Sequence, residues 1–143
     1  MLAIKFRSLE IATLEINTWQ KAWDLIQNKF DNLSDAIKHP KQGFLVGALE
    51  SVDNFEDRTI VYAKIFGNKF SIGINPIVID GEMRGLCKIW QYDETDSKRI
   101  VDFFYLGLEG DIMEQSGKVI LNKDIEEFEY VLLCNILCAV LSD

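Results

Sequence analysis

The residue types that most often carry chemistry are few in this sequence, and their spacing does not predict a shared reaction. His39 is the only histidine; it precedes Pro40 in a predicted loop, and no nucleophile or acid is paired with it locally. Cys134 and Cys138 lie four residues apart in an apolar segment, which is typical of small core side chains. Cys87 falls in an apolar strand pattern, whereas a reactive thiol needs exposure and a nearby positive charge. An enzyme that uses Cys87 or carboxylates is therefore the last-ranked hypothesis.

Metal and cofactor motifs are not recognisable either. A zinc site needs four Cys, His or carboxylate ligands at recognisable spacing, which these residues do not supply. The acidic runs at 53–57 and 93–96 lack the Asp-x-Asp-x-Asp-Gly order and the distal glutamate of a calcium loop. The glycine spacings match neither a phosphate-binding loop nor a dinucleotide fingerprint. We therefore expect no metal, no cofactor and no catalytic residue.

The charge of the chain is acidic and unevenly distributed. The net charge is −8; residues 1–41 carry six basic and five acidic side chains, a net of +1, which leaves −9 for residues 42–143. Phosphate backbones bind surfaces rich in Lys and Arg, so we expect no nucleic-acid partner. An acidic surface instead attracts basic partners during encounter, although acidity also serves solubility alone.

Aromatic side chains stand next to the acidic loops. Aromatic anchors surrounded by charge are typical of tight protein interfaces. We therefore predict a non-enzymatic protein-binding module of the immunity or antitoxin kind, which would neutralise a basic toxic enzyme such as a nuclease. The predicted partner-binding residues are Asp53, Glu56, Asp57, Tyr92, Asp93, Glu94 and Asp96.

Location follows from the cysteines and the amino terminus. The number of cysteines is odd, and charge interrupts the first residues before the apolar stretch of a secretion signal can form. The longest apolar run, Tyr130–Leu141, has twelve residues, whereas a membrane span needs roughly 20. We expect a cytoplasmic protein with no membrane association.

The first 43 residues predict a strand followed by helix. Alternating apolar residues predict a strand over Leu2–Phe6, and 9–16 is ambiguous between strand and helix. From about Asn17, apolar residues recur every three or four positions as far as Phe30. Ser34 is expected to cap a short second helical turn that ends before Pro40.

The central part of the chain predicts a run of about five strands. Phe44–Leu49 and the β-branched and aromatic stretch 59–66 are strand-like, and Gly67-Asn68 predicts a hairpin turn into 69–74. Segment 76–79 is expected to be extended, and segments 86–92 and 100–108 to form two more strands. Residues 109–117 are expected to form a loop.

The chain ends in a predicted helix. Asp124 and Glu127 resemble a capping box, and the helix beyond Tyr130 is apolar on nearly every side, so it is either a core element or an oligomer interface. No strand–helix–strand alternation appears. The predicted fold is therefore a single α+β domain over 1–143, with an antiparallel sheet of five to six strands and both helices packed on one face.

This order of elements resembles the helix-grip family of lipid- and hormone-binding domains, although the last helix is short for that family. The resemblance implies the alternative function of a small-molecule binder with an apolar cavity. Trp90, Phe104, Leu132 and Ile136 would line that cavity.

Overall fold

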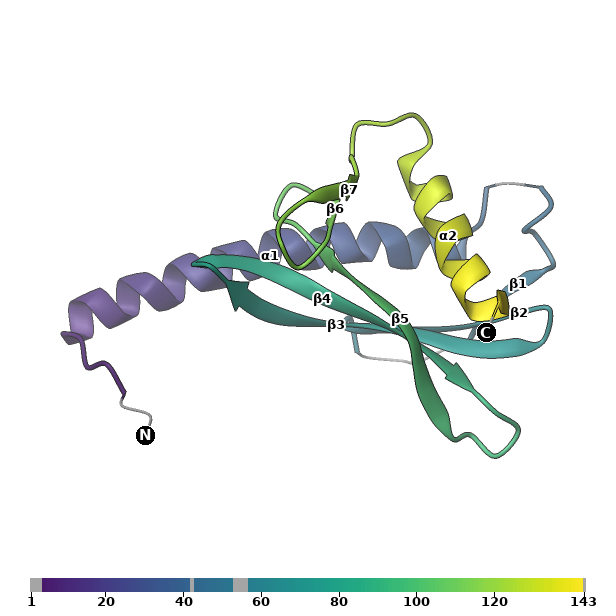
Figure 1. The fold of residues 1–143 in the computed structure, drawn as a ribbon, viewed down its shortest axis with the longest axis horizontal. Coiled ribbons are helices and arrows are strands. Elements are labelled where there is room, and N and C mark those ends of the chain that lie inside the picture. The colour runs from purple at the N-terminus through teal and green to yellow at the C-terminus, as the bar shows by residue number, and fades with distance from the viewer. Residues whose placement is uncertain (1–3, 42, 53–56, 143) are drawn as a thin grey trace.

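The chain folds into a long helix, a seven-stranded antiparallel sheet and a shorter helix, so the predicted α+β class is confirmed with more strands than expected (Figure 1). The computed structural model describes residues 4–41, 43–52 and 57–142. In chain order the elements are α1 (Leu9–Lys38), β1 (Leu49–Val52), β2 (Ile60–Ile65), β3 (Asn68–Ile79), β4 (Glu82–Tyr92), β5 (Lys98–Leu106), β6 (Ile112–Met113), β7 (Val119–Leu121) and α2 (Phe128–Ser142).

Helix α1 is one continuous helix of 30 residues, so the predicted start near Asn17 and the separate second helix are both wrong. The side chain of Ser8 caps the helix by accepting a hydrogen bond from the Ile11 N–H, at 3.3 Å. At the other end, the backbone N–H of His39 donates to the Asp35 carbonyl at 2.8 Å. Pro40 follows and lacks the N–H needed to continue the helix.

The strand predicted over Leu2–Phe6 is also wrong where it can be judged. Residues 4–8 pair with no strand and lead directly into α1; residues 2 and 3 lie outside the described part of the chain. An alternating pattern describes which face a strand would bury, but a strand also needs a hydrogen-bonding partner.

The strands of the sheet follow one another in chain order from β1 to β7, each antiparallel to its neighbours. Phe66 and Gly67 join β2 to β3, and Asp80 and Gly81 join β3 to β4. All four residues have positive φ, between 49° and 80°. Two-residue turns with positive φ match the right-handed twist of the flanking strands. The predicted hairpin therefore forms, with its turn one residue earlier than the Gly67-Asn68 pair, and Asp80-Gly81 makes the turn of a second hairpin.

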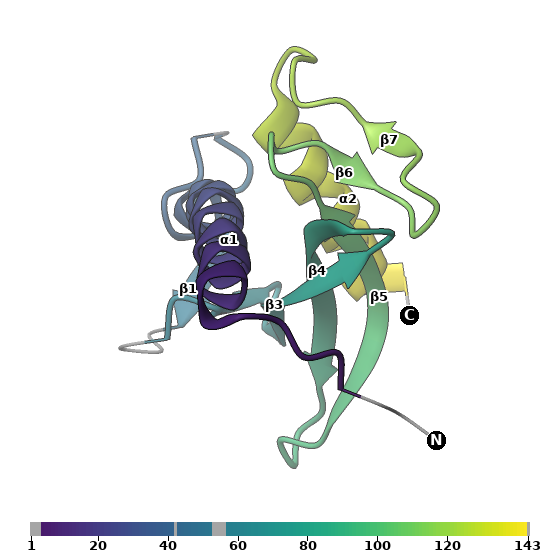
Figure 2. The same cartoon turned by 90° about the vertical axis from the view of Figure 1, so that its left-hand side faces the viewer.

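Both helices cover the same face of the sheet (Figure 1). Along β2 and β3, side chains alternate between the buried helix side and the opposite side, and the sheet twists strongly (Figure 2). The C-terminal half of α1 supplies fully buried Ile26, Phe30 and Ile37. It packs tightly against Gly85 on β4, where an added Cβ would lie 2.8 Å from Ile26 Cγ2. Glycine at that position lets the helix seat on the strand.

Local predictions around the sheet ends were less accurate. The apolar run Phe44–Leu49 forms turns, and β1 begins only at its last residue, Leu49. Strand β6 lies inside the stretch predicted to be a loop, because two-residue pairings leave little periodicity. The predicted capping box does not form, since α2 begins at Phe128 after a turn in which Glu127 has φ 57°.

Helix α2 packs against β4, β5 and α1, with Leu133 and Val140 among its buried side chains. Within the described residues, no helix combines the length and the apolar character that crossing a membrane requires.

Candidate functional site

The sheet face turned away from both helices is a candidate binding surface, and we call it the open face. The register aligns Tyr62, Ser71, Trp90 and Ile100 in one row across four strands. Cross-strand partners share a face, and rows two residues away along each strand point to that same face. The side chains of the open face are Tyr62, Lys64, Lys69, Ser71, Lys88, Trp90, Tyr92, Lys98, Ile100 and Phe103.

Two tyrosines and a lysine form the best-connected group on the open face. The rings of Tyr62 and Tyr92 have centroids 6.2 Å apart, and the Tyr92 hydroxyl lies 3.0 Å from the Ser71 hydroxyl. Lys69 Nζ stands 5.0 Å from the Tyr92 centroid and 5.8 Å from that of Tyr62. Burial, with the neighbouring Tyr92 as a further cause, raises the pKa of the Tyr62 phenol. The rings are thus held in fixed orientations before any partner arrives.

The remaining aromatics of the open face lie toward β5. Lys98 Nζ is 4.6 Å from the Trp90 ring centroid, and Phe103 packs edge-on against Tyr105 at 6.1 Å. Phe103 nevertheless exposes about half of its side chain. Partly exposed, preorganised aromatics are the side chains that dominate binding energy in protein interfaces.

Four of the predicted partner-binding residues lie together at the edge of the open face, in or next to the β4–β5 turn. Tyr92 ends β4, and Asp93, Glu94 and Asp96 follow it directly. Asp96 forms an ion pair with Lys69, at 3.6 Å between Oδ1 and Nζ. We call Asp93, Glu94 and Asp96 the acidic turn.

Asp93 organises the acidic turn. Its Oδ1 accepts hydrogen bonds from the backbone N–H groups of Thr95 and Ser97, at 2.8 and 3.0 Å, and from the Thr95 hydroxyl. The Thr95 hydrogen bonds lower the pKa of Asp93 below its ordinary value. This carboxylate therefore has a structural role besides any contact with a partner.

The other predicted residues are not in this group. Asp57 lies just before Ile60, the first residue of β2. The acidic turn lies near the other end of β2, because Asp96 contacts Lys69 and Lys69 pairs with Lys64. The Asp57 carboxylate accepts hydrogen bonds from Thr59. Asp53 and Glu56 lie outside the described residues. Sequence reasoning missed Tyr62, Lys69 and Phe103 as open-face residues, although alternation along the predicted strands and the hairpin at Gly67 would have placed Tyr62 and Lys69 on one face.

The charges at the open face balance. The face has four lysines, and the acidic turn together with Glu50, the cross-strand partner of Lys64, supplies four carboxylates. The face itself therefore does not select a partner by net charge. Any selection by charge comes from the long-range electrostatic field of the whole chain.

A second exposed surface lies at the start of α1. The helix runs past the tip of the β3–β4 hairpin, so its first turns project beyond the sheet (Figure 1). We call residues 4–18 the projection. Its large apolar side chains expose between 53% and 89% of their surface; they are Ile4, Phe6, Leu9, Ile11, Leu14 and Ile16.

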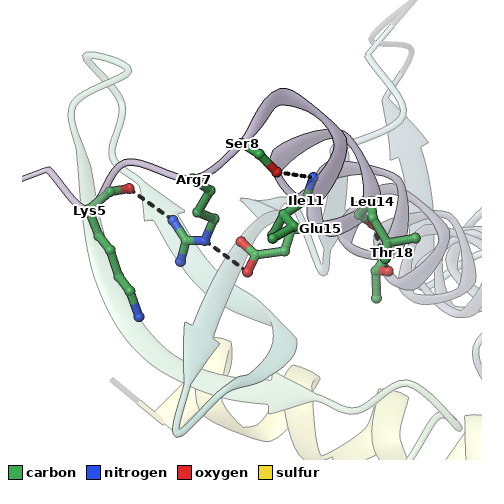
Figure 3. Close-up of polar contacts among 7 residues, drawn as sticks. All are labelled: Lys5, Arg7, Ser8, Ile11, Leu14, Glu15 and Thr18. Atoms are coloured by element: carbon green, nitrogen blue, oxygen red, sulfur yellow. Dashed lines mark hydrogen bonds and ion pairs between the residues drawn. The ribbon is translucent and has the colours of Figure 1, made fainter.

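The projection is held in helical order by local polar contacts (Figure 3). Arg7 Nε donates to Glu15 Oε1 at 2.9 Å, which ties the residues before the helix to its second turn. Thr18 Oγ1 donates to the Leu14 carbonyl at 2.9 Å, and Ser8 caps the first turn. These contacts fix the helix itself but leave its apolar side chains uncovered.

The residues of the helix-grip alternative do not line one cavity. Phe104, Leu132 and Ile136 line a space of about 280 Å³ between the sheet and α2, whereas Trp90 lies on the open face, on the other side of the sheet. Pockets that bury drug-sized ligands have volumes of roughly 300–1,000 Å³. The space lined by Phe104, Leu132 and Ile136 is therefore small for a lipid-like ligand.

Cys87 and His39, the two residues considered for nucleophilic or acid–base chemistry, lie in different parts of the fold. Burial raises the pKa of the Cys87 thiol, which is fully inaccessible on β4. His39 borders a groove of about 820 Å³ between the end of α1 and the start of α2, together with Asp35, Glu127 and Tyr130. Among the described residues, no three His, Cys, Asp or Glu side chains cluster closely enough to hold a metal ion.

Comparison of the chain with protein-family models, with curated proteins and with solved structures gave no match.

Proposed function

We propose that this chain is a non-enzymatic protein-binding module that docks its partner on the open face. The observation that supports this most is the preorganised group of aromatic side chains on the open face, in which Tyr62, Trp90 and Tyr92 are partly exposed and left uncovered by both helices. A two-layer α+β domain has no structural need for so many aromatics on its solvent side, because polar side chains suffice there.

The class of partner follows from charge. The chain has a net charge of −8, so its long-range field attracts basic proteins and repels acidic ones. The acidic turn stands beside the aromatics, where it can contact basic side chains at the edge of an interface. An inhibitor that neutralises a basic toxic enzyme, in the manner of immunity and antitoxin proteins, fits both features.

The test is co-purification of the tagged full chain with the products of its neighbouring genes at low and high salt. We expect a stoichiometric complex with a basic protein whose association rate falls as salt screens the attraction. Failure to retain a partner at either salt concentration would contradict the proposal.

Variants separate local contact from long-range attraction. Glu94→Lys changes the acidic turn, and Glu126→Lys makes the same charge change on the exposed turn before α2. Both variants weaken the field equally, so a greater loss of affinity for Glu94→Lys assigns the contact to the acidic turn. Phe103→Ser should speed dissociation without slowing association, because it removes an exposed aromatic and no charge. Equal binding by all three variants would mean that the partner docks elsewhere.

A further inference from the structure

The apolar stripe of α1 is longer than the sheet that covers it. Apolar residues at alternating spacings of three and four run the whole length of the helix; they are Leu9, Ala12, Ile16, Trp19, Trp23, Ile26, Phe30, Leu33 and Ile37. From Ile26 onward, these side chains are at most 3% exposed, whereas Leu9 and Ile16 are 84% and 64% exposed. The buried half of the helix, which packs on the sheet, and the exposed half thus have the same spacing of apolar residues.

The stripe on the projection is open to solvent. Leu9 and Ile16 expose 84% and 64% of their surface, and four more large apolar side chains of the projection are each more than half exposed. Several large apolar side chains exposed on one short segment are typical of an interaction surface. Since Ser8 and the Arg7–Glu15 pair already order the helix, covering it costs little conformational entropy.

Charge indicates what covers the projection. Its two basic side chains, Lys5 and Arg7, balance its two acidic ones, Glu10 and Glu15, so the projection is neutral and the remaining residues hold the whole net charge of −8. Pairing at this segment therefore brings no net like charge of its own together, while the net negative charge of each copy stays on the rest of the chain. Repulsion between two bodies of the same charge is smallest when they are far apart.

We infer that the projection is a self-association surface on which two copies of this chain pair their α1 helices in antiparallel fashion. A stripe spaced by three and four residues is the seam along which helices pack against helices. Ala12, between Leu9 and Ile16, is small enough to let the two helices approach closely. Antiparallel pairing also places the two acidic sheets at opposite ends of the helix pair. The length of helix that projects, roughly 15 Å, then separates the two sheets. This surface is separate from the open face, so a dimer presents two open faces.

The test is sedimentation equilibrium of the full chain, the Ile16→Glu variant and the Leu25→Glu variant. Leu25 lies on the same helix and is also half exposed, at 52%, but it is outside the projection, so its variant matches the charge change without touching the seam. We expect a dimer for the wild type and for Leu25→Glu, and a monomer for Ile16→Glu. Circular dichroism should show the same fold in all three, because both side chains face water.

Salt gives an independent readout with a distinctive sign. Self-association should hold or strengthen as salt rises, because salt screens the repulsion between two copies of charge −8. A wild-type chain that sediments as a monomer at every concentration would overturn the inference, as would equal dimerisation of the two variants. A monomeric wild type that loses its co-purified partner on Ile16→Glu would assign the projection to that partner instead.

Discussion

At the scale of single residues, Arg84 is a buried cation on β4 with incomplete compensation. Its Nη1 donates to the Gln115 carbonyl at 2.9 Å, its Nη2 is 4.0 Å from the half-exposed Glu82 carboxylate, and its Nε has no hydrogen-bond partner among the described residues. The guanidinium also fills the space beside Gly117, where an added Cβ would lie 3.0 Å from Nη2. Arg84 therefore holds the β6–β7 turn against β4, at the cost of burying a charge.

Truncation of Arg84 should destabilise the protein more than neutralising it does. Arg84→Ala loses the hydrogen bond to Gln115 and the packing of the aliphatic stem, and should lower the free energy of unfolding by about 2–3 kcal/mol. Arg84→Met keeps most of the packing without a buried charge, so most of that loss should be recovered. Urea denaturation measures both; equal losses would mean that the charge itself stabilises the fold.

Asp93 should contribute to the acid stability of the β4–β5 hairpin. Hydrogen bonds from Thr95 hold its pKa below the ordinary value of 3.8 in the folded chain. Its stabilisation is therefore complete above about pH 4 and is lost as the pH falls through the lower folded pKa. Asp93→Asn should lower stability at neutral pH and flatten the acid limb of the stability profile, measured by thermal unfolding from about pH 2 to pH 7.

The neighbouring Glu94→Gln serves as the control for Asp93→Asn. It removes a charge from the same turn but leaves the hydrogen bonds of Asp93 to Thr95 and Ser97 in place. If Glu94→Gln flattens the acid limb of the stability profile as much as Asp93→Asn does, the effect is due to net charge and not to the hydrogen bonds of Asp93.

At the scale of elements, the close packing of α1 on β4 depends on Gly85, which has no side chain at the contact. A Cβ at Gly85 would lie 2.5 Å from Ile74 Cδ1 and 2.8 Å from Ile26 Cγ2, so in Gly85→Ala the side chains of Ile74 and Ile26 must shift. Overpacking of this kind should cost about 1–3 kcal/mol.

Gly73 on β3 gives the matched substitution. A Cβ added there would meet its nearest atoms at 3.6 and 3.7 Å, which is ordinary contact. Gly73→Ala should therefore be neutral or stabilise the fold by up to about 0.5 kcal/mol. Urea midpoints compare the two variants. Similar losses for both would show that the helix does not press on β4 at Gly85.

The elements with strong local signals could be predicted from the sequence. Strands β2 to β5 follow from alternation and turn residues, because each pairs with its chain neighbour through a short turn. The start of α1 could not, because Leu9–Ile16 fits both strand and helix and only the Ser8 cap decides between them. Strands β6 and β7 are too short for a period, and their pairing follows from the position of β5.

The candidate surfaces were predicted less completely for the same physical reason. The acidic turn is contiguous in sequence, so composition found it. The open face joins residues of four strands, and Lys69 meets Tyr92 only through the register of β3 with β4. The exposure of the projection depends on where the sheet ends, which no local pattern of α1 encodes.

At the scale of the whole molecule, self-association and stability should be linked. Only folded chains associate, so dimerisation stabilises the folded state. The midpoint of thermal unfolding should therefore rise with protein concentration. For Ile16→Glu the midpoint should be independent of concentration, while Leu25→Glu should follow the wild type. Differential scanning calorimetry over a hundredfold concentration range checks this; a constant wild-type midpoint would contradict it.

The order of the strands also has a consequence for how the chain reaches its fold. Since every strand pairs with the strand next to it in sequence, the sheet can grow by successive short loop closures, each entropically inexpensive. The contacts of α1 with β4, β5 and α2, and those of α2 with β4 and β5, join parts of the chain that are far apart in sequence. Folding kinetics should therefore be governed by the arrival of the two helices on a sheet that is already formed, and rapid hairpin formation should precede a slower docking step.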